Sequence, residues 1–272
     1  PVMLPALIAT DVDGTLLDPH ERVTPRTRAA VQAAVANGAR FVLATGRPPR
    51  WIPPVVEGLG LAPLAVCANG AVVYDAATDR VVSAHTLTPD ALGELAEIAT
   101  RVIPGVGLAV ERVGRSAFDE SVPQFASSPG YEHAWHNPDN TEVSVEDMLS
   151  VPAVKLLIRK AGVHSAELAA ALAPHVGITG DLTYSTNNGL IEVVPLGISK
   201  ATGVAEILRP LGISSEDVVT FGDMPNDIPM LSWAGLGVAM GNAHPEALAA
   251  ADEVTTTNSD DGVARVLERW WL

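Results

Sequence analysis

Short apolar runs alternate with segments of helical pattern along most of this chain, and this alternation restricts the possible folds more than any other feature. Residues 6–10, 41–44 and 218–221 are such runs, each short enough to form one buried strand. Between the first two runs, Thr24 can cap a helix whose first residue is Pro25. Strands that alternate with helices are typical of a parallel sheet joined by crossover helices. The sequence therefore predicts the α/β fold class.

The pattern changes near residue 84 and returns near residue 187. Residues 84–186 contain five of the seven histidines and an irregular stretch, 114–147, that is rich in Ser, Pro, Gly and Asn. The elements expected there are helices at 88–102 and 165–172 and strands near 106–111, 154–159 and 182–185. Because the alternation resumes with a strand at 191–194, we expect a discontinuous core, 1–83 and 187–272, with an inserted α+β module at 84–186.

The charge balance argues against several classes of partner. The chain has 272 residues, with 17 Lys and Arg against 32 Asp and Glu, which gives a net charge of −15. A strongly acidic protein repels nucleic acid and anionic membrane surfaces, and it attracts divalent cations. We therefore expect a small-molecule ligand, no nucleic-acid or membrane partner, and a monomer or homodimer.

Cysteine usage and the apolar runs bear on localisation. Cys67 is the only cysteine, so the chain cannot form an intrachain disulfide, and a reducing compartment fits best. The longest uncharged runs, 58–74 and 228–245, are broken by Gly and Pro and are unsuited to a membrane span. No basic residue precedes Arg22, so the apolar start of the sequence lacks the charged flank of a secretory signal. We expect a cytoplasmic protein.

Two acidic clusters follow predicted strands at the point where each strand ends. The first is Asp11-Val12-Asp13-Gly14-Thr15, after residues 6–10, and the second is Gly222-Asp223-Met224-Pro225-Asn226-Asp227, after residues 218–221. Ligands bind beyond the carboxyl ends of the strands in an open α/β sheet, so the two clusters can meet at one edge. Each cluster alone could be an ordinary strand-end turn or helix cap. Together they predict a site for Mg²⁺, which prefers oxygen ligands and would offset the repulsion between the carboxylates.

Two further segments carry groups suited to binding phosphate. Ala44-Thr45-Gly46-Arg47 ends the strand at 41–44 and offers a hydroxyl, a flexible backbone N–H and a guanidinium group, although a plain strand-to-helix turn has the same composition. Lys200 opens the helix expected at 201–208, where the helix dipole disfavours a cation. A surface position would explain this lysine, but it could also neutralise clustered carboxylates and substrate charge.

The ordered set of motifs resembles the haloacid dehalogenase (HAD) superfamily, and within it the Cof-type phosphatases with a class IIB cap. The resemblance rests on residues 11–15, 45–47, Ala68-Asn69-Gly70-Ala71, Lys200, 222–227 and 237–243, which span nearly the whole chain. It implies a Rossmann-like parallel-sheet core with an inserted C2-type α/β cap that governs substrate specificity. It also implies Mg²⁺-dependent hydrolysis of small phosphate monoesters, such as sugar phosphates or phosphorylated cofactors, through an aspartyl-phosphate.

The resemblance further implies a role for each matching residue. Asp11 is similar to the nucleophile and Asp13 to the general acid/base, and attack by Asp11 would split one hard displacement into two easier ones. The implied metal ligands are the Asp11 side chain, the Asp13 backbone carbonyl and Asp223. The other implied roles are Thr45, Gly46 and the catalytic Lys200 on the phosphate oxygens, Arg47 and Asn69 on the substrate, Asn226 on the phosphate or Lys200, and Asp227 on metal-bound water.

Other interpretations of the sequence remain open. A phosphomutase would use the same aspartyl-phosphate, and a non-catalytic protein could bind a phosphorylated ligand with the same residues. His133 and His136 have a spacing that could ligate a metal on a helix, but the surrounding Pro, Asn and Gly favour a loop. The residues of the inserted module that could meet the leaving group are Arg112, Arg115, His133, His136, Lys155 and Arg159.

Overall fold

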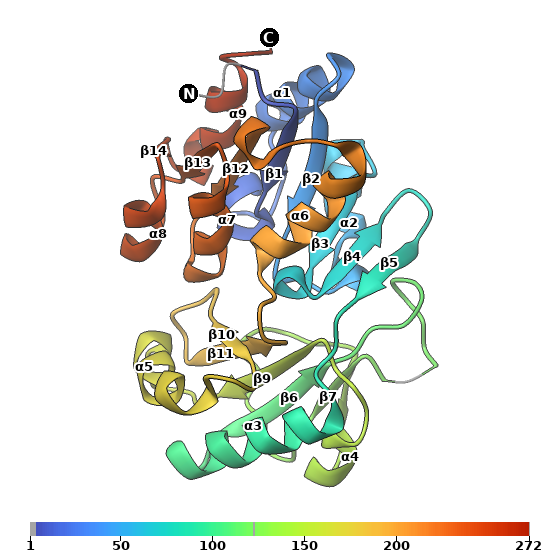
Figure 1. The fold of residues 1–272 in the computed structure, drawn as a ribbon, viewed down its shortest axis with the longest axis vertical. Helices are drawn as coiled ribbons and strands as arrows, with labels where there is room; N and C mark the ends of the chain where they lie inside the picture. The colour runs from blue at the N-terminus through green and yellow to red at the C-terminus, as the bar shows by residue number, and fades with distance from the viewer. Residues whose placement is uncertain (1–3, 122, 272) are drawn as a thin grey trace. The chain divides into compact units, whose positions relative to one another are not determined.

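The computed structural model describes residues 4–121 and 123–271, which form two compact units (Figure 1). The core unit consists of the described residues up to 82 and from 199 onward, and the cap unit consists of those between 83 and 198. Residues 1–3 and 272 of the predicted core, and residue 122 of the predicted module, lie outside the described residues. Within the described ranges, no helix has both the length and the apolar character needed to cross a bilayer.

An eight-stranded sheet forms the centre of the core unit, in the order β14-β13-β12-β1-β2-β3-β4-β5. The strands from β14 to β3 are parallel, and β4 pairs antiparallel with β3. The strands are β1 (Leu7–Thr10), β2 (Arg40–Ala44), β3 (Leu64–Cys67), β4 (Val72–Asp75), β5 (Arg80–Ala84), β12 (Val218–Gly222), β13 (Leu236–Ala239) and β14 (Glu253–Val254). The helices are α1 (Pro25–Ala36), α2 (Pro53–Leu59), α6 (Lys200–Leu211), α7 (Ile228–Trp233), α8 (Pro245–Ala250) and α9 (Gly262–Leu267). The predicted α/β fold is confirmed.

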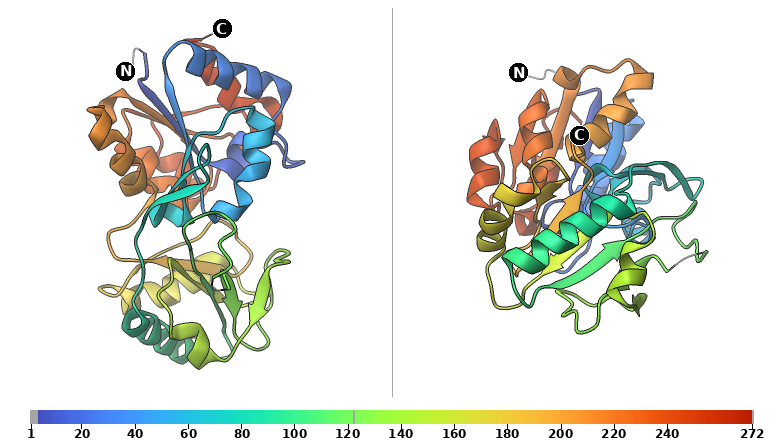
Figure 2. Two further views of the ribbon diagram at one scale, coloured as in Figure 1. Left: turned by 90° about the vertical axis from the view of Figure 1, so that its right-hand side faces the viewer. Right: turned by 60° about the horizontal axis from the view of Figure 1, so that its bottom comes forward.

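Helices cover both faces of this sheet, as the apolar parallel strands require. α6 and α7 lie on one face, and α1, α2 and α9 lie on the other (Figure 2, left). α1 begins where the sequence predicts, because the Thr24 side chain accepts a hydrogen bond from the Thr27 backbone N–H and Pro25 is the first helical residue.

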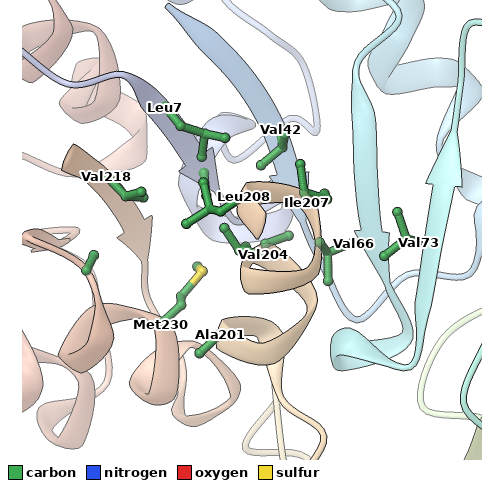
Figure 3. Close-up of a cluster of buried hydrophobic side chains, with 13 residues drawn as sticks. Leu7, Val42, Val66, Val73, Ala201, Val204, Ile207, Leu208, Val218 and Met230 are labelled. Carbon is green, nitrogen blue, oxygen red and sulfur yellow. The ribbon is translucent and has the colours of Figure 1, made fainter. Parts of the chain in front are cut away.

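A cluster of buried aliphatic side chains joins the parallel strands to α6 and α7 (Figure 3). Leu7 of β1, Val42 of β2 and Val66 of β3 belong to it, as does Val204 of α6, and all four are at most 3% exposed. Full burial of a side chain of this size contributes about 1.5–3 kcal/mol to stability. The packing thereby fixes α6, whose first residue is Lys200, against the strands that end in the acidic clusters.

The cap unit is built on a second, six-stranded sheet, in the order β10-β11-β9-β6-β7-β8. Its strand pairs are antiparallel except for β7 with β8. The strands are β6 (Gly107–Glu111), β7 (Phe125–Ser127), β8 (Asn140–Glu142), β9 (Lys155–Arg159), β10 (Asp181–Thr183) and β11 (Leu190–Val194). The helices are α3 (Pro89–Val102), α4 (Val145–Leu149) and α5 (Ser165–Val176).

The structure differs from the sequence-based expectation at the end of this unit. The strand expected at 191–194 in the core is β11, which pairs antiparallel with β9 and β10 in the cap sheet. An apolar strand that is buried on both faces has the same pattern in either sheet, so its sequence does not identify its neighbours. The irregular stretch 114–147 also contains β7, β8 and most of α4, which are three to five residues long and too short for a periodic signal.

Candidate active site

The two acidic clusters leave the core sheet side by side. β1 and β12 are parallel neighbours, and Thr10 lies opposite Phe221 at their carboxyl ends. The Asp11 backbone N–H donates to the Phe221 carbonyl oxygen at 3.0 Å and continues the ladder by one residue. Both clusters therefore open onto the same edge of the sheet, where an open α/β fold binds its ligands.

Three buried carboxylates form the centre of the site. One oxygen from each of Asp11, Asp223 and Asp227 lies within 4.8 Å of the other two, and these residues are at most 7% exposed. The Thr15 hydroxyl bridges two of them, at 3.2 Å from Asp11 Oδ2 and 3.3 Å from Asp223 Oδ1. Hard oxygen ligands at this spacing suit a divalent cation such as Mg²⁺. Thr15 belongs to the first sequence motif, but its bridging contact depends on a residue far along the chain.

Lys200 supplies positive charge to this cluster. Ser199 caps α6 by accepting a hydrogen bond from the Thr202 backbone N–H, which places Lys200 at the first helical position. The Lys200 Nζ donates to Asp11 Oδ1 at 2.9 Å and to Asp227 Oδ1 at 2.6 Å, and the residue is fully buried. The alternative of a surface lysine is therefore wrong. Three carboxylates face one ammonium group, and a divalent cation would neutralise the excess negative charge.

The crowding of these charges changes the proton affinity of the acids. Burial, followed by the charge of Asp227, raises the pKa of Asp11 above that of an ordinary carboxyl group. Burial, followed by the charge of Asp11, raises the pKa of Asp223. Burial alone would lower the pKa of Lys200, but the Asp11 and Asp227 carboxylates outweigh it and raise that pKa. Without a cation, the two acids therefore hold protons more tightly than they would in an unfolded chain.

We expect Asp223→Asn to stabilise the cation-free protein. The pKa of Asp223 is higher in the folded chain than in the unfolded chain, so protonated Asp223 favours folding, and this contribution is complete below about pH 4. The contribution is lost as the pH rises from there toward the folded-state pKa, because the unfolded chain then releases the proton more readily than the folded chain does. At pH 7 the asparagine variant should therefore have a free energy of unfolding about 1–3 kcal/mol higher than the wild type, measured by urea unfolding in EDTA.

Added Mg²⁺ serves as the control for this experiment. A cation that binds only the folded chain stabilises it by mass action, so Mg²⁺ should raise the unfolding midpoint of the wild type. The Asp223→Asn variant should respond little, because it lacks one of the three carboxylates. A variant that is less stable than the wild type in EDTA would contradict the repulsion between Asp11 and Asp223.

Gly14 is required where the chain turns away from β1. Its φ is +76°, and a Cβ at this position would lie 2.1 Å from Asp223 Oδ2. Only glycine permits both this left-handed backbone and so close an approach. The Gly14 carbonyl oxygen accepts a hydrogen bond from Asn242 Nδ2 at 2.9 Å, and Asn242 Oδ1 accepts one from the Asn258 backbone N–H at 3.0 Å. Asn242 thus braces the turn, a role that no local sequence pattern reveals.

Asp227 is held by its own segment as well as by Lys200. Its Oδ2 accepts hydrogen bonds from the backbone N–H groups of Asp223, at 2.8 Å, and Met224, at 3.0 Å. Gly222 makes this approach possible, because a Cβ there would lie 2.4 Å from the Asp227 Cβ. Both oxygens of Asp227 therefore have protein donors, and the carboxylate orders the loop that carries Asp223.

The end of β2 carries the second group of predicted residues. Thr45 is buried, its Oγ1 accepts a hydrogen bond from the Arg47 backbone N–H at 3.0 Å, and its carbonyl oxygen accepts one from the Asn69 N–H. Gly46, between Thr45 and Arg47, is partly buried. The Arg47 guanidinium donates to both oxygens of Asp13, at 2.7 and 2.8 Å. The Asp13 side chain thus lies outside the three-carboxylate group and is held by Arg47.

Two buried asparagines meet beside these strand ends. Asn226 Nδ2 donates to Asn69 Oδ1 at 3.1 Å. The remaining amide atoms, Asn69 Nδ2 and Asn226 Oδ1, are buried without a hydrogen-bond partner among the described residues. Because buried polar groups are nearly always paired, these two atoms are available to a bound ligand. Gly70 allows this turn to pack directly against the start of α6, because a Cβ at this position would lie 1.9 Å from the Ser199 carbonyl oxygen.

Most cationic candidates of the cap unit have partners within that unit. The Lys155 Nζ donates to Glu192 Oε1 at 2.5 Å, and both residues are buried. Arg112 and Arg159 donate to backbone carbonyl groups. The His133 ring packs edge-on against an aromatic ring at a centroid distance of 4.9 Å, in a segment outside helices and strands, so the expected loop is confirmed. The candidates with exposed positions are Arg115 and His136.

Similarity to known proteins agrees with this arrangement. A sequence profile of the haloacid dehalogenase-like hydrolases matches residues 8–267, a range that contains every residue of the site. The chain belongs to this family. The 5-amino-6-(5-phospho-D-ribitylamino)uracil phosphatase YcsE of Bacillus subtilis is 30% identical to it, over 98% of this chain and 96% of the relative. The HMP-PP phosphatase of Serratia proteamaculans is 29% identical, over 97% and 94%. The chain is thus an enzyme of a hydrolase family whose named relatives include phosphatases.

Solved structures share the fold. A haloacid dehalogenase-like hydrolase from Bacteroides thetaiotaomicron has a TM-score of 0.73 and 26% identity, with 97% of this chain and 99% of that chain covered. A sugar phosphatase of HAD subclass IIB has a TM-score of 0.80 and 24% identity, with 97% and 98% covered. The expected family and the fold of a HAD core with an inserted cap are confirmed.

Proposed function

We propose that this enzyme is a Mg²⁺-dependent phosphatase that hydrolyses small phosphate monoesters through an aspartyl-phosphate on Asp11. Sugar phosphates and phosphorylated cofactors are the proposed substrate classes. The observation that carries the proposal is the buried group of Asp11, Asp223, Asp227 and Lys200 at the strand ends. The names of the relatives support it, since one is a phosphatase of a phosphorylated ribitylaminouracil and another is an HMP-PP phosphatase.

The side chains of Asp11 and Asp223 would hold the cation, together with the backbone carbonyl of Asp13. Their fit to Mg²⁺ rests on the close spacing of the carboxylates and on the excess negative charge around Lys200. When bound, Mg²⁺ reduces the repulsion between an anionic nucleophile and an anionic phosphate. Asp227, whose oxygens already have protein donors, is assigned to ordering Lys200 and nearby water.

Asp11 is the nucleophile of the proposed reaction. A carboxylate oxygen of Asp11 bonds to phosphorus, the bond from phosphorus to the leaving oxygen breaks, and Asp13 donates a proton to that oxygen. In the second half, Asp13 takes a proton from water as the water attacks phosphorus, and inorganic phosphate leaves Asp11. Lys200 and Thr15 orient the nucleophile, because each donates to a different oxygen of the Asp11 carboxylate.

Donors around Asp11 are assigned to the phosphate oxygens. An ammonium group has three N–H donors, and the two carboxylate partners of Lys200 take two of them. The Thr45 hydroxyl and the Gly46 N–H belong to the neighbouring strand end, and the Asn69 amide donor has no partner among the described residues. Phosphoryl transfer depends mainly on such positioning and charge stabilisation.

We assign recognition of the leaving group to residues 83–198. Every residue assigned above to phosphoryl transfer belongs to the core unit. The family resemblance implies that the inserted module governs substrate specificity, and this assignment follows it. Among its cationic candidates, Arg115 and His136 have exposed positions, whereas Lys155 is engaged in a buried ion pair.

A phosphate-release screen over a panel of monoesters, ranked by kcat/KM, tests the proposed function. We expect turnover with Mg²⁺, loss of turnover in EDTA, and recovery when Mg²⁺ is restored, because the carboxylates need a counter-charge to accept an anionic substrate. Full activity of protein shown to be free of metal would contradict the metal requirement. A rearranged ester in place of inorganic phosphate would identify a phosphomutase, and binding without turnover would identify a non-catalytic protein.

A further inference from the structure

We propose that Arg47 is a positioning residue that holds the carboxylate of Asp13, in place of the substrate-binding role that the family resemblance implies for it. This inference rests on the proposed function, in which Asp13 is the general acid/base. Arg47 Nε donates to Asp13 Oδ2 at 2.8 Å, and its terminal Nη2 donates to Asp13 Oδ1 at 2.7 Å. Two parallel hydrogen bonds of this kind fix the plane of a carboxylate as well as its position.

The guanidinium group is itself anchored on its third nitrogen. Arg47 Nη1 donates to the Trp51 carbonyl oxygen at 2.9 Å. The backbone is held as well, because the Arg47 N–H donates to Thr45 Oγ1 and the Arg47 carbonyl oxygen accepts from the Ala68 N–H, both at 3.0 Å. Every nitrogen of the guanidinium thus has a protein partner, and these three contacts fix the group in position, while two of its five N–H donors are not used by them.

Asp13 depends on this contact for its orientation. Its side chain is 53% exposed, whereas that of Arg47 is only 16% exposed. A half-exposed carboxylate without such a partner would sample several rotamers. A general acid/base must lie within hydrogen-bond reach of the leaving oxygen when it is protonated and of the attacking water when it is a carboxylate, so a fixed orientation of Asp13 raises the fraction of productive encounters.

Replacement of Arg47 by lysine separates the two roles. Lysine keeps the positive charge and remains a good phosphate ligand, but it cannot form the two-pronged contact with a carboxylate. If Arg47 binds phosphate, Arg47→Lys should keep most of its function. If Arg47 holds Asp13, the variant should lose the benefit of the general acid.

The choice of leaving group shows whether the variant has lost phosphate binding or general acid catalysis. p-Nitrophenolate is a stable anion and leaves without a proton, whereas an alkoxide needs one. The value of kcat/KM reports the steps up to formation of the aspartyl-phosphate, where the proton is donated. General acid catalysis contributes about 10²–10⁴-fold, so Arg47→Lys should reduce kcat/KM for the best alkyl monoester by about tenfold or more. The loss for p-nitrophenyl phosphate should stay within about threefold.

Three further measurements make the test decisive. The inhibition constant of inorganic phosphate should be nearly unchanged in Arg47→Lys, because the variant keeps its phosphate ligands. Asp13→Asn should show the same preference for the nitrophenyl ester, and the double variant should lose little more than Asp13→Asn alone. Arg26→Lys is the matched control, because Arg26 forms the same two-pronged contact with Glu268 on the surface of the core unit. It should change neither ester.

Two results would overturn the proposal. Equal losses on both esters with a raised inhibition constant for phosphate would make Arg47 a phosphate ligand. Losses below about twofold on both esters would show that the contact with Asp13 has no part in turnover. Failure of the proposed function has a different signature, since the wild type would then hydrolyse neither ester.

Discussion

Asp11→Asn should abolish turnover and leave the fold intact. The change replaces one carboxylate oxygen by nitrogen, so the shape is kept, but the nucleophile and one of the three negative charges of the cluster are lost. The asparagine carbonyl oxygen can still accept the hydrogen bond that Lys200 donates. Loss of a nucleophile costs several orders of magnitude, so we expect kcat to fall by at least about a thousandfold.

The assay needs a control for the general effect of removing a charge. Asp217 is an exposed aspartate immediately before β12, at the opposite end of that strand from the acidic cluster. Asp217→Asn should keep the activity of the wild type within about twofold, because surface substitutions rarely matter. Circular dichroism and urea unfolding would show that both variants are folded. Wild-type rates in a verified Asp11→Asn preparation would refute the aspartyl-phosphate mechanism.

Lys200→Met should destabilise the protein more than any other change considered for the site. The methionine fills a similar volume but leaves the partners of Lys200, Asp11 and Asp227, buried without their counter-charge. Removing one partner from a buried ion pair costs about 3–5 kcal/mol. Urea unfolding measures the loss, and Mg²⁺ should recover part of it because the cation replaces some of the missing positive charge.

Lys160→Met is the corresponding control. Lys160 is a lysine of the cap unit whose Nζ lies 3.4 Å from the Pro104 carbonyl oxygen in an exposed contact. Its replacement should change the free energy of unfolding by no more than about 0.5 kcal/mol. If Lys200→Met were as stable as this control, the buried ion pairs of Lys200 would not exist in solution.

The sequence predicts those parts of the site whose residues lie within one short segment of the chain. Asp11 and Asp223 each follow an apolar run directly, so a local pattern places them at the ends of strands, and the topology of parallel strands brings the ends together. Gly14 is predictable for the same reason, because the sharp turn it permits lies within the motif. Its positive φ confirms that turn.

The contacts that no local pattern predicts are those between distant segments. Arg47 and Asp13 lie 34 positions apart, and Asn226 and Asn69 lie 157 positions apart, so their pairing depends on the completed sheet. The short elements near the end of the chain were also beyond prediction. β14 has two residues and α9 has six, which is too little sequence for either a strand or a helix to show its period.

The insertion of the cap unit between the two parts of the core has a consequence for biosynthesis. A nascent chain acquires Asp11 before the cap unit is made, and it lacks Lys200 and Asp223 until the cap unit has been made. β1 can pair with β12 only after both strands have been synthesised. The hydrogen bond from Thr15 to Asp223 joins residues 208 positions apart, and contacts between residues so distant in sequence form slowly during folding. The acidic cluster is therefore incomplete on the ribosome until the second core segment, which carries Lys200, Asp223 and Asp227, has been made after the cap unit.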